Sequence, residues 1–373
     1  MLLATFLLAI VSLAYACELP HHQHAKRNLN STLGKRWYGV DHLTEETQYL
    51  RGPWPDVFGD GTTPIRFCFD DENSYNNLLA LIQDAINLWQ PAMDVSTLTI
   101  EPSCGVGNWD CICDEDTHYD TLIIGDVTDE EDGFTKATQG HQYIKREDRE
   151  RQDDGRYWYN FLAVKRDEPR GFSRWWDLHA VAHELGHVAG LDHEHQRPDA
   201  AEKGFYWSCT MLNDADSVHR RIANREEGTW REGDTFQKAC NDFDTAERYG
   251  FSATGVMAKP TNFLGEGVWS KDLDWGSIMI YSSYRNEKRL SEKPAGVKFP
   301  EGSWMYRRYY EGRSPRSIEI LSGGITIDAA TRAYDYSTVR ISDGDIARIA
   351  QLYPSGEDGE PSGDHAEGWE QAE

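Results

Sequence analysis

Basic residues are scarce in this sequence. Lys and Arg account for 38 of its 373 residues, against 63 Asp and Glu, which gives a formal net charge of -25. Nucleic acid and anionic membrane surfaces would repel so acidic a chain, so we expect neither as a partner. The charge balance fits a soluble secreted protein.

Long apolar runs are scarce as well. Residues 2–16 form the one marked run, and it is too short to span a membrane as a helix. It ends in Ala-Tyr-Ala, a pattern typical of signal-peptide cleavage, so we predict a secretory signal peptide at residues 1–16. A bacterial lipoprotein anchor on Cys17 is the alternative, although the residues before it match that motif poorly.

The next segment, residues 17–36, is polar and ends in the dibasic pair Lys35-Arg36. Dibasic pairs are cleaved by eukaryotic processing peptidases, although on a solvated segment they can simply be charges. We predict a propeptide at residues 17–36, a folded domain at 37–354, and a disordered acidic tail at 355–373, where little can be buried.

Cysteines are few, and their number is informative. Loss of Cys17 leaves six, enough for three disulfides in an oxidising compartment, with the connectivity left open. A small metal cluster at Cys104, Cys111 and Cys113 is a weaker alternative. The six are Cys68, Cys104, Cys111, Cys113, Cys209 and Cys240.

Apolar periodicity predicts a mixed set of helices and strands. We expect a strand at 63–69 and then a helix at 73–90, which Pro91 ends and whose apolar positions recur every three to four residues. A Ser cap precedes a closing helix at 342–353. Further strands are expected at 96–101, 119–125 and 157–164.

Two longer stretches carry weaker signals. Residues 199–272 show no strong periodicity, and we interpret them as ordered loops held by Cys209 and Cys240. Residues 285–332 are interpreted as an insertion of short strands and loops.

The most informative stretch is His-Glu-x-x-His at residues 183–187. On a helix, His183 and His187 lie one turn apart on one face, so both can bind one metal ion, and Glu184 stands beside them. Gly190 can adopt the left-handed conformation that ends a helix, which returns the chain and delivers His193 as a third ligand. Three protein ligands leave the fourth position of Zn²⁺ open to water, which is typical of catalytic zinc.

A helix with two surface histidines is the plain alternative, but it leaves Gly190 and His193 unexplained. For His179, one turn before His183, we favour a structural or supporting role, because three ligands suffice. The opposite helix face is apolar and predicts burial against a sheet; its residues are Leu178, Val181, Ala182, Leu185, Val188 and Ala189.

The segment 183–199, HELGHVAGLDHEHQRPD, resembles the extended signature of astacin-type metzincin zinc peptidases. Glu194 directly follows the third His, and Arg197 and Asp199 have the family's spacing. The sequence departs from the family where Ala200-Ala201 follow. The resemblance implies that Glu194 pairs through water with the new N-terminus that propeptide removal creates.

A second stretch, Ser-Ile-Met-Ile-Tyr at 277–281, is similar to the astacin Met-turn, with Ile280 in place of the usual His. The resemblance implies that Met279 forms an apolar floor under the zinc and that Tyr281 is a fifth, displaceable ligand. On its own, the stretch would be interpreted as a buried strand or turn.

The implied fold is α+β, the metzincin or zincin fold. Its N-terminal part is a twisted sheet with a backing helix and the zinc helix, and its smaller, irregular C-terminal subdomain contains the Met-turn and the closing helix. Residues 133–137 correspond to the family's upper-rim strand, which holds substrate in an extended form.

The resulting hypothesis is a secreted, monomeric, zinc-dependent endopeptidase that acts on proteins or peptides. Glu184 would be the general base, and Tyr281 would donate a hydrogen bond to the oxyanion. A catalytically silent adhesion or binding module that keeps zinc for structure is the alternative. Glu184 separates the two, because a binding module has no need of a base beside an open zinc site.

Overall fold

The computed structural model describes a large part of the chain, and contacts divide it into two compact units. The first unit comprises residues 42–191 and 343–373, and the second comprises 1–41 and 192–342. The predicted signal peptide and propeptide, and all but the first residue of the predicted tail, lie outside the described residues. These are 51–57, 59–105, 107–131, 133–142, 159–167, 174–259, 272–281, 305–311, 314–319, 324, 326–327 and 334–355.

The first unit is built on a five-stranded sheet with the order β3-β2-β4-β7-β5. The first four of these strands are parallel, and β5 runs antiparallel to β7 at one edge. The predicted strand at 63–69 is confirmed as β2. The others are β3 (Leu98–Pro102), β4 (Leu122–Asp126), β5 (Lys136–Ala137) and β7 (Asn160–Val164).

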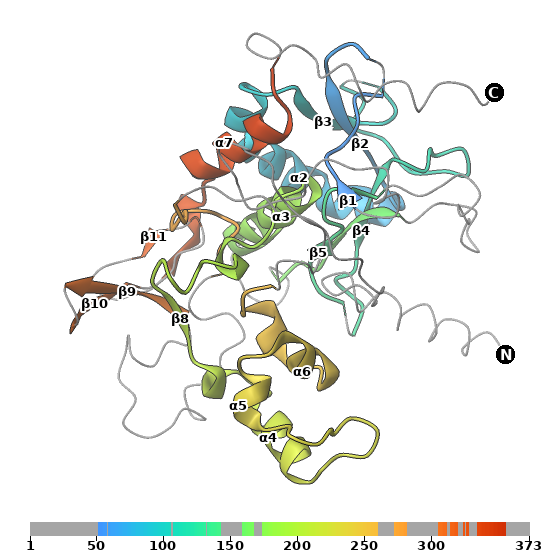
Figure 1. Cartoon of the computed structure of the whole chain (residues 1–373). Helices are drawn as coiled ribbons and strands as arrows, with labels where there is room; N and C mark the ends of the chain where they lie inside the picture. The colour runs from blue at the N-terminus through green and yellow to red at the C-terminus, as the bar shows by residue number, and fades with distance from the viewer. Residues whose placement is uncertain are drawn as a thin grey trace, which may run out of the picture. The chain divides into compact units, whose positions relative to one another are not determined.

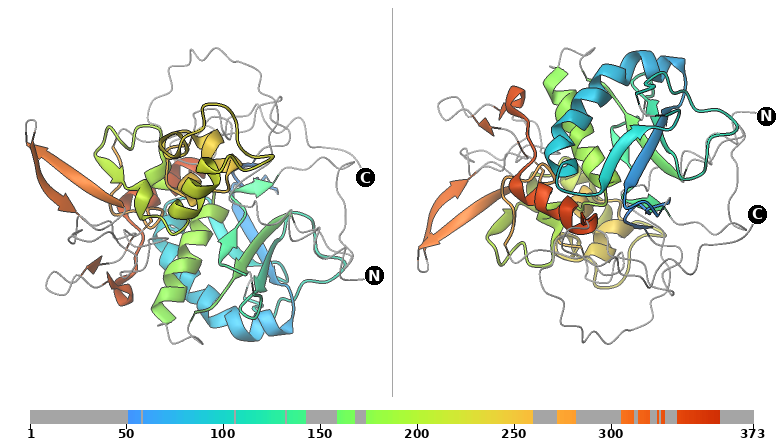
Figure 2. Two further views of the ribbon diagram at one scale, coloured as in Figure 1. Left: turned by 90° about the horizontal axis from the view of Figure 1, so that it is seen from below. Right: turned by 90° about the horizontal axis from the view of Figure 1, so that it is seen from above.

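Two long helices, α2 (Glu72–Met93) and α3 (Arg174–Val188), lie side by side against this sheet (Figures 1 and 2). Helix α2 contacts β2, β3 and β4, whereas α3 contacts β5 and β7, so the pair covers one face. The indole Nε1 of Trp89 on α2 donates to the carbonyl of Ala182 on α3 at 2.9 Å. The buried apolar residues include Ile65, Phe67, Phe69, Leu78, Ile82, Leu122, Ile124, Leu162, Val181 and Leu185.

Helix α2 begins where its cap residue predicts and ends later than expected. The side chain of Asp71 accepts a hydrogen bond from the Ser74 amide at 2.7 Å, which satisfies one free N–H of the first turn. The prediction that Pro91 ends the helix was wrong, because the helix continues to Met93. A proline in the last turn removes only one backbone hydrogen bond, which a long, well-packed helix tolerates.

The closing helix is confirmed as α7 (Asp343–Leu352), and it packs on α2. Two short strands, β1 (Arg51–Gly52) and β6 (His141–Gln142), form a separate antiparallel pair. Because the backbone amide of Trp54, just after β1, donates to the Tyr353 hydroxyl at 3.2 Å, the start and end of the described chain meet in this unit.

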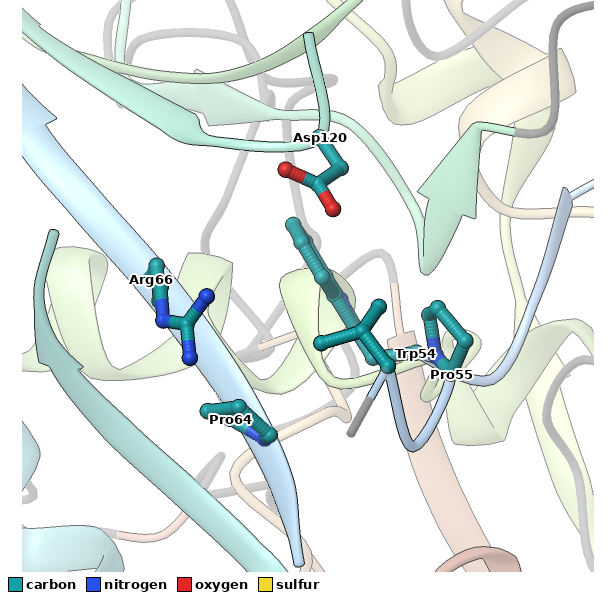
Figure 3. Close-up of a pocket in the computed structure, with 6 residues that line it drawn as sticks. Trp54, Pro55, Pro64, Arg66 and Asp120 are labelled. Carbon is teal, nitrogen blue, oxygen red and sulfur yellow. The ribbon is translucent and has the colours of Figure 1, made fainter. Parts of the chain in front are cut away.

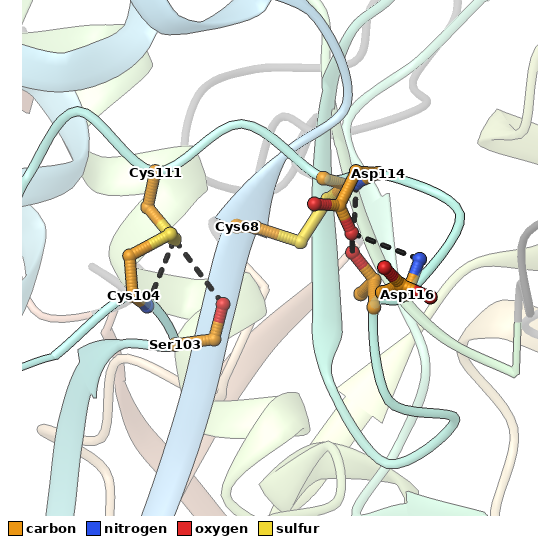
Figure 4. The surroundings of a disulfide bond; sticks show 8 residues. Cys68, Ser103, Cys104, Cys111, Asp114 and Asp116 are labelled. Atoms are coloured by element: carbon orange, nitrogen blue, oxygen red, sulfur yellow. Dashed lines mark hydrogen bonds between the residues drawn. A yellow bond between two sulfur atoms is a disulfide. The ribbon is translucent and has the colours of Figure 1, made fainter.

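All six predicted disulfide cysteines are paired. Cys68 bonds to Cys113 and Cys104 bonds to Cys111, in a region where the Cys111 sulfur also accepts from the Cys104 amide at 3.0 Å (Figure 4). The third disulfide joins Cys209 to Cys240 in the second unit. The alternative of a metal cluster at the first group of cysteines was therefore wrong.

The second unit contains helices that the sequence did not predict. Instead of loops alone, residues 199–259 form α4 (Ala215–Ala223), α5 (Phe236–Ala239), α6 (Phe243–Arg248) and the short turns η5 (Cys209–Met211) and η6 (Ser252–Gly255). A further short turn, η4 (Glu194–Gln196), precedes them. Their buried side chains form one apolar cluster, which includes Met211, Leu212, Val218, Ile222, Phe243, Tyr249, Phe251 and Val256. Helices α5 and α6 are too short to show a clear period in sequence, whereas α4 buries Ala215, Val218 and Ile222 at helical spacing, a signal that the sequence analysis missed.

The predicted insertion does contain short strands. Strand β8 (Phe205–Trp207) pairs with β9 (Met305–Glu311), which pairs with β10 (Ser314–Glu319), all antiparallel. A further pair joins β11 (Thr326–Ile327) to β12 (Tyr334–Asp335), followed by η8 (Tyr336–Thr338). Among the described helices, none has the length and apolar character needed to cross a membrane.

Asp234 is a buried, charged residue in the cluster formed by helices α4 to α6, which we call the helical cluster. Its buried carboxylate accepts hydrogen bonds from Arg248 Nη1 at 2.9 Å, the Tyr249 hydroxyl at 3.1 Å and the Arg231 amide at 2.9 Å. Burial alone raises the pKa of Asp234, but these donors and the charges of Arg248 and Lys238 hold the pKa below its ordinary value of 3.8.

We expect Asp234→Asn to lower the Tm at pH 7 by roughly 4 to 8 °C, since charged hydrogen bonds are lost. A carboxyl whose pKa falls on folding stabilises the fold above its unfolded pKa, and that contribution disappears as the pH falls through the folded value. The Tm difference from wild type should therefore shrink below about pH 4. The exposed Asp244, changed to Asn, is the control. A difference independent of pH would contradict the expectation.

Candidate metal centre

Helix α3 places the first two predicted ligands on one face. The rings of His183 and His187 lie edge to face with centroids 4.9 Å apart, as expected for residues one helical turn apart. Both side chains are buried, as is Glu184 between them in sequence, at 5% exposure. The predicted apolar face of the helix is buried as well, which fixes the direction in which the two histidines point.

Gly190 ends the helix in the conformation that the sequence predicts. Its φ is 95°, a left-handed value that favours glycine. The Gly190 amide donates to His187 O at 2.8 Å and the Leu191 amide donates to Gly186 O at 2.9 Å. This pair of hydrogen bonds is a Schellman motif, which closes a helix and turns the chain back.

The turn brings His193 to the other two histidines. One ring nitrogen from each of His183, His187 and His193 lies within 4.8 Å of the others, and all three side chains are buried. Two Zn–N bonds of about 2.0–2.1 Å place their nitrogens no more than about 4.2 Å apart, so a small movement of the rings is enough for all three to reach one ion. His179, which we expected to have a supporting role, is half-buried and does not belong to this group.

Two of these histidines have an oriented ring. His187 Nδ1 lies 2.7 Å from the Leu191 carbonyl oxygen, and His193 Nδ1 lies 2.8 Å from Gln196 Oε1. Both partners are acceptors, so each Nδ1 carries the proton and each Nε2 carries the lone pair. Hydrogen bonds of this type orient metal-binding histidines and set their tautomer.

The last carbonyls of α3 are bound by distant parts of the first unit. Trp54 Nε1 donates to Val188 O at 2.7 Å, and the Tyr353 hydroxyl donates to Ala189 O at 3.0 Å. The Gly140 amide donates to His187 O at 2.8 Å. Sequence reasoning missed these residues, because no local pattern indicates which distant donor reaches a helix end.

Tyr281 and Met279 lie on the turn that follows Ser277. The Tyr281 ring is 4.4 Å from the His193 ring, centroid to centroid, at an interplanar angle of 61°. Its amide donates to His195 Nδ1 at 3.3 Å, and the His195 ring lies 4.5 Å away. Met279 is fully buried, and its carbonyl accepts from the Glu194 amide at 3.1 Å.

Buried charges follow the third histidine. Arg197, with no exposed side-chain surface, donates from Nη1 to Glu194 Oε1 at 2.9 Å and forms a two-point contact with Asp199, each hydrogen bond being 3.0 Å long. Glu194 Oε1 also accepts from the Asp274 amide at 2.7 Å. The expected pairing of Glu194 with a processed N-terminus involves residues outside the described part of the chain.

A hollow near β1 is lined by Trp54, Pro55, Val57, Pro64, Arg66 and Asp120. Figure 3 shows Arg66 and Pro64 facing Trp54 across it, with Asp120 near the ring edge. Burial raises the pKa of Asp120, but His118 and the nearby cations outweigh this effect and lower it. The interior holds about 10 Å³, enough for a single water molecule and too little for a peptide side chain.

No protein-family model and no curated protein matches this sequence. Solved structures do match. High choriolytic enzyme 1, a hatching enzyme zinc-protease from the medaka fish Oryzias latipes, is 13% identical with a TM-score of 0.41, and the match covers 84% of this chain and 98% of that one. Two structures of myroilysin match at 13% and 14% identity with TM-scores of 0.38 and 0.34, covering 81% and 85% of this chain and 95% and 100% of theirs.

These likenesses are distant, and the class of the site rests on its own residues. The chain resembles astacin-type metzincin zinc peptidases in its motif, and the structure brings the motif's three histidines together around a space that could hold a metal ion. The fold is mixed, with a five-stranded sheet and few long helices.

We expect Gly190→Ala to cost about 1–2 kcal/mol of folding free energy, because an alanine is strained at positive φ. It should also weaken zinc binding, since this turn delivers His193. Gly250 is a matched control: its φ is 55° and a Cβ there would meet nothing within 4 Å. Gly250→Ala should therefore lower stability alone. Urea unfolding and chelator competition measure the two effects, and unaltered zinc affinity in Gly190→Ala would refute the assigned role of the turn.

Proposed function

We propose that this protein is a secreted zinc-dependent endopeptidase that hydrolyses peptide bonds in proteins. One observation carries the proposal: three buried histidines offer ring nitrogens within 4.8 Å of one another, and two of them, His183 and His187, lie on the helix that also carries Glu184. Three neutral imidazoles suit Zn²⁺ and leave one of its four positions open. A zinc ion held there would supply a Lewis acid that lowers the pKa of bound water and polarises the substrate carbonyl.

The protein's own residues divide the remaining work. His183, His187 and His193 would hold the ion. Glu184 accepts the proton of the attacking water and then passes it to the leaving amine, as general base and general acid in turn. Its side chain is 5% exposed and follows directly after His183 on the same helix.

Tyr281 is proposed to donate a hydrogen bond from its hydroxyl to the oxyanion that develops on the substrate carbonyl. Its ring stands 4.4 Å from that of His193, which supports a place beside the metal. Such a contact strengthens as negative charge builds up, so it stabilises the transition state more than the bound substrate.

The finer assignments belong to the same proposal. We propose the metzincin fold, with the turn at 277–281 as its Met-turn and Met279 as the floor beneath the metal. Three disulfides support an oxidising, extracellular location. The proposed partners are protein or peptide substrates, without nucleic acid or membrane, and the proposed state is a monomer.

A catalytically silent module that keeps zinc for structure is the second candidate, and the histidine triad alone would suit it. A structural zinc site has four protein ligands, however, and among the residues that the structure describes this group contains three. Glu184 would also have no role in such a module. We therefore prefer the peptidase.

We expect Glu184→Gln to abolish hydrolysis of casein or a peptide library while zinc stays bound. Loss of a general base removes at least about 10²–10⁴-fold in rate, and the amide keeps the shape of the side chain. Metal content is measured in the same preparation, so that loss of zinc is not mistaken for loss of the base. Hydrolysis at the wild-type rate would refute the role of Glu184 as the general base.

We expect Tyr281→Phe to lower kcat by about 10²-fold with little change in KM, because the lost hydrogen bond acts mainly in the transition state. Steady-state kinetics on one peptide substrate separates the two constants. Should KM rise with kcat unchanged, Tyr281 would instead contribute to substrate binding.

A further inference from the structure

Gln196 is a buried polar residue that the proposed chemistry does not use. It ends the short turn η4 that follows the third histidine, and its exposed fraction is 2%. A glutamine side chain loses hydrogen bonds to water when it is buried, so its position in the interior depends on the partners that replace them.

The partners of Gln196 determine which way its amide points. Nε2 lies 2.8 Å from the Thr254 carbonyl oxygen and 3.4 Å from the Met257 carbonyl oxygen. Carbonyl oxygens only accept, so the NH₂ group must face them and Oε1 must face the other way. Oε1 lies 2.8 Å from His193 Nδ1, which therefore donates.

The segment that holds Gln196 is itself well anchored. The Lys259 amide donates to Gln196 O at 3.0 Å, and Lys259 Nζ lies 2.9 Å from Asp192 Oδ1. At the start of this segment, Ser252 donates to Asp214 from its amide at 2.8 Å and from its hydroxyl at 2.6 Å. Residues 252–259 thus hold the turn 192–196 at both ends.

The third ligand differs from the second in how it is oriented. The carbonyl that accepts from His187 belongs to the helix's own C-terminal turn, at Leu191. For His193 the acceptor is a side chain, and that side chain is fixed by the separate segment 252–259. Replacing one residue can therefore remove the restraint on His193 without changing the helix.

We propose that Gln196 is a positioning residue for the third metal ligand, fixing the tautomer and ring orientation of His193 so that Nε2 faces the ion. The inference rests on the proposed zinc site. Without the acceptor at Gln196, the ring populates the tautomer with the proton on Nε2 and rotates more freely, and both changes oppose metal binding. Loss of such a hydrogen-bond partner typically weakens metal affinity by roughly 10–100-fold.

Two substitutions separate orientation of the ligand from anchoring of the loop. Gln196→Met has a similar length and offers no oxygen to His193. Gln196→Glu keeps an oxygen acceptor for His193 but, like Met, cannot donate to the Thr254 and Met257 carbonyls. Because Glu also buries a charge, it should lower the Tm of the metal-free protein at least as much as Met does.

The readout is zinc affinity of the full chain, measured by competition with a chromophoric chelator. We expect Gln196→Met to weaken zinc binding by roughly 10–100-fold and Gln196→Glu to keep it close to wild type, despite the lower Tm. Thr235→Ala is the control for general loss of stability, since it removes the hydrogen bond that caps α5, outside the segment 252–259. Its zinc affinity should be that of wild type.

Three results would overturn the inference: equal losses of affinity in Gln196→Met and Gln196→Glu, no loss in either, or a loss in Thr235→Ala as large as in Gln196→Met. The first and third would mean that Gln196 only stabilises the loop. A wild-type chain that binds no zinc would refute the proposed function itself, and this outcome is distinct from the other three.

Discussion

The last turn of α3 is the constraint on which the candidate metal centre depends. A helix leaves its final carbonyl groups without intrahelical donors, and buried carbonyls need partners. Here the donors come from Trp54, Gly140 and Tyr353, which are distant from one another in sequence. The last turn of α3 is thus hydrogen-bonded to three separate parts of the chain: the segment after β1, the connection between β5 and β6, and the residue after α7. The exit direction of the chain at Gly190 follows from that arrangement.

After this turn, the chain is held by contacts between buried charged side chains. Arg197 contacts Glu194 and Asp199, and Glu194 also accepts from the Asp274 amide. Desolvation of buried ion pairs offsets much of their Coulombic gain, so such a network adds little net stability. What it contributes is geometry, because removing one member would leave a buried charge without its partner. The network therefore fixes the position of the segment after His193 relative to the turn that carries Met279 and Tyr281.

Sequence reasoning succeeded where the determinants are local. The 183–187 spacing, the left-handed Gly190 and the strand at 63–69 each depend on neighbouring residues, and each is confirmed. It failed where tertiary contacts decide. Helices α4 to α6 are short and polar on one side, and they are stabilised by Asp234 and Cys209–Cys240, which no periodicity reveals. Gln196 stood within the quoted motif, but only its fold-dependent carbonyl partners give it a role.

His187 and His193 are therefore oriented by different parts of the structure. His187 is oriented by Leu191, so its geometry persists as long as the helix end does. His193 is oriented through Gln196 and residues 254–257, so its geometry depends on the helical cluster around Asp234. Metal binding contributes its free energy only to states in which all ligands are in place. A bound metal would consequently stabilise the arrangement of Gln196 and residues 254–257 that orients His193.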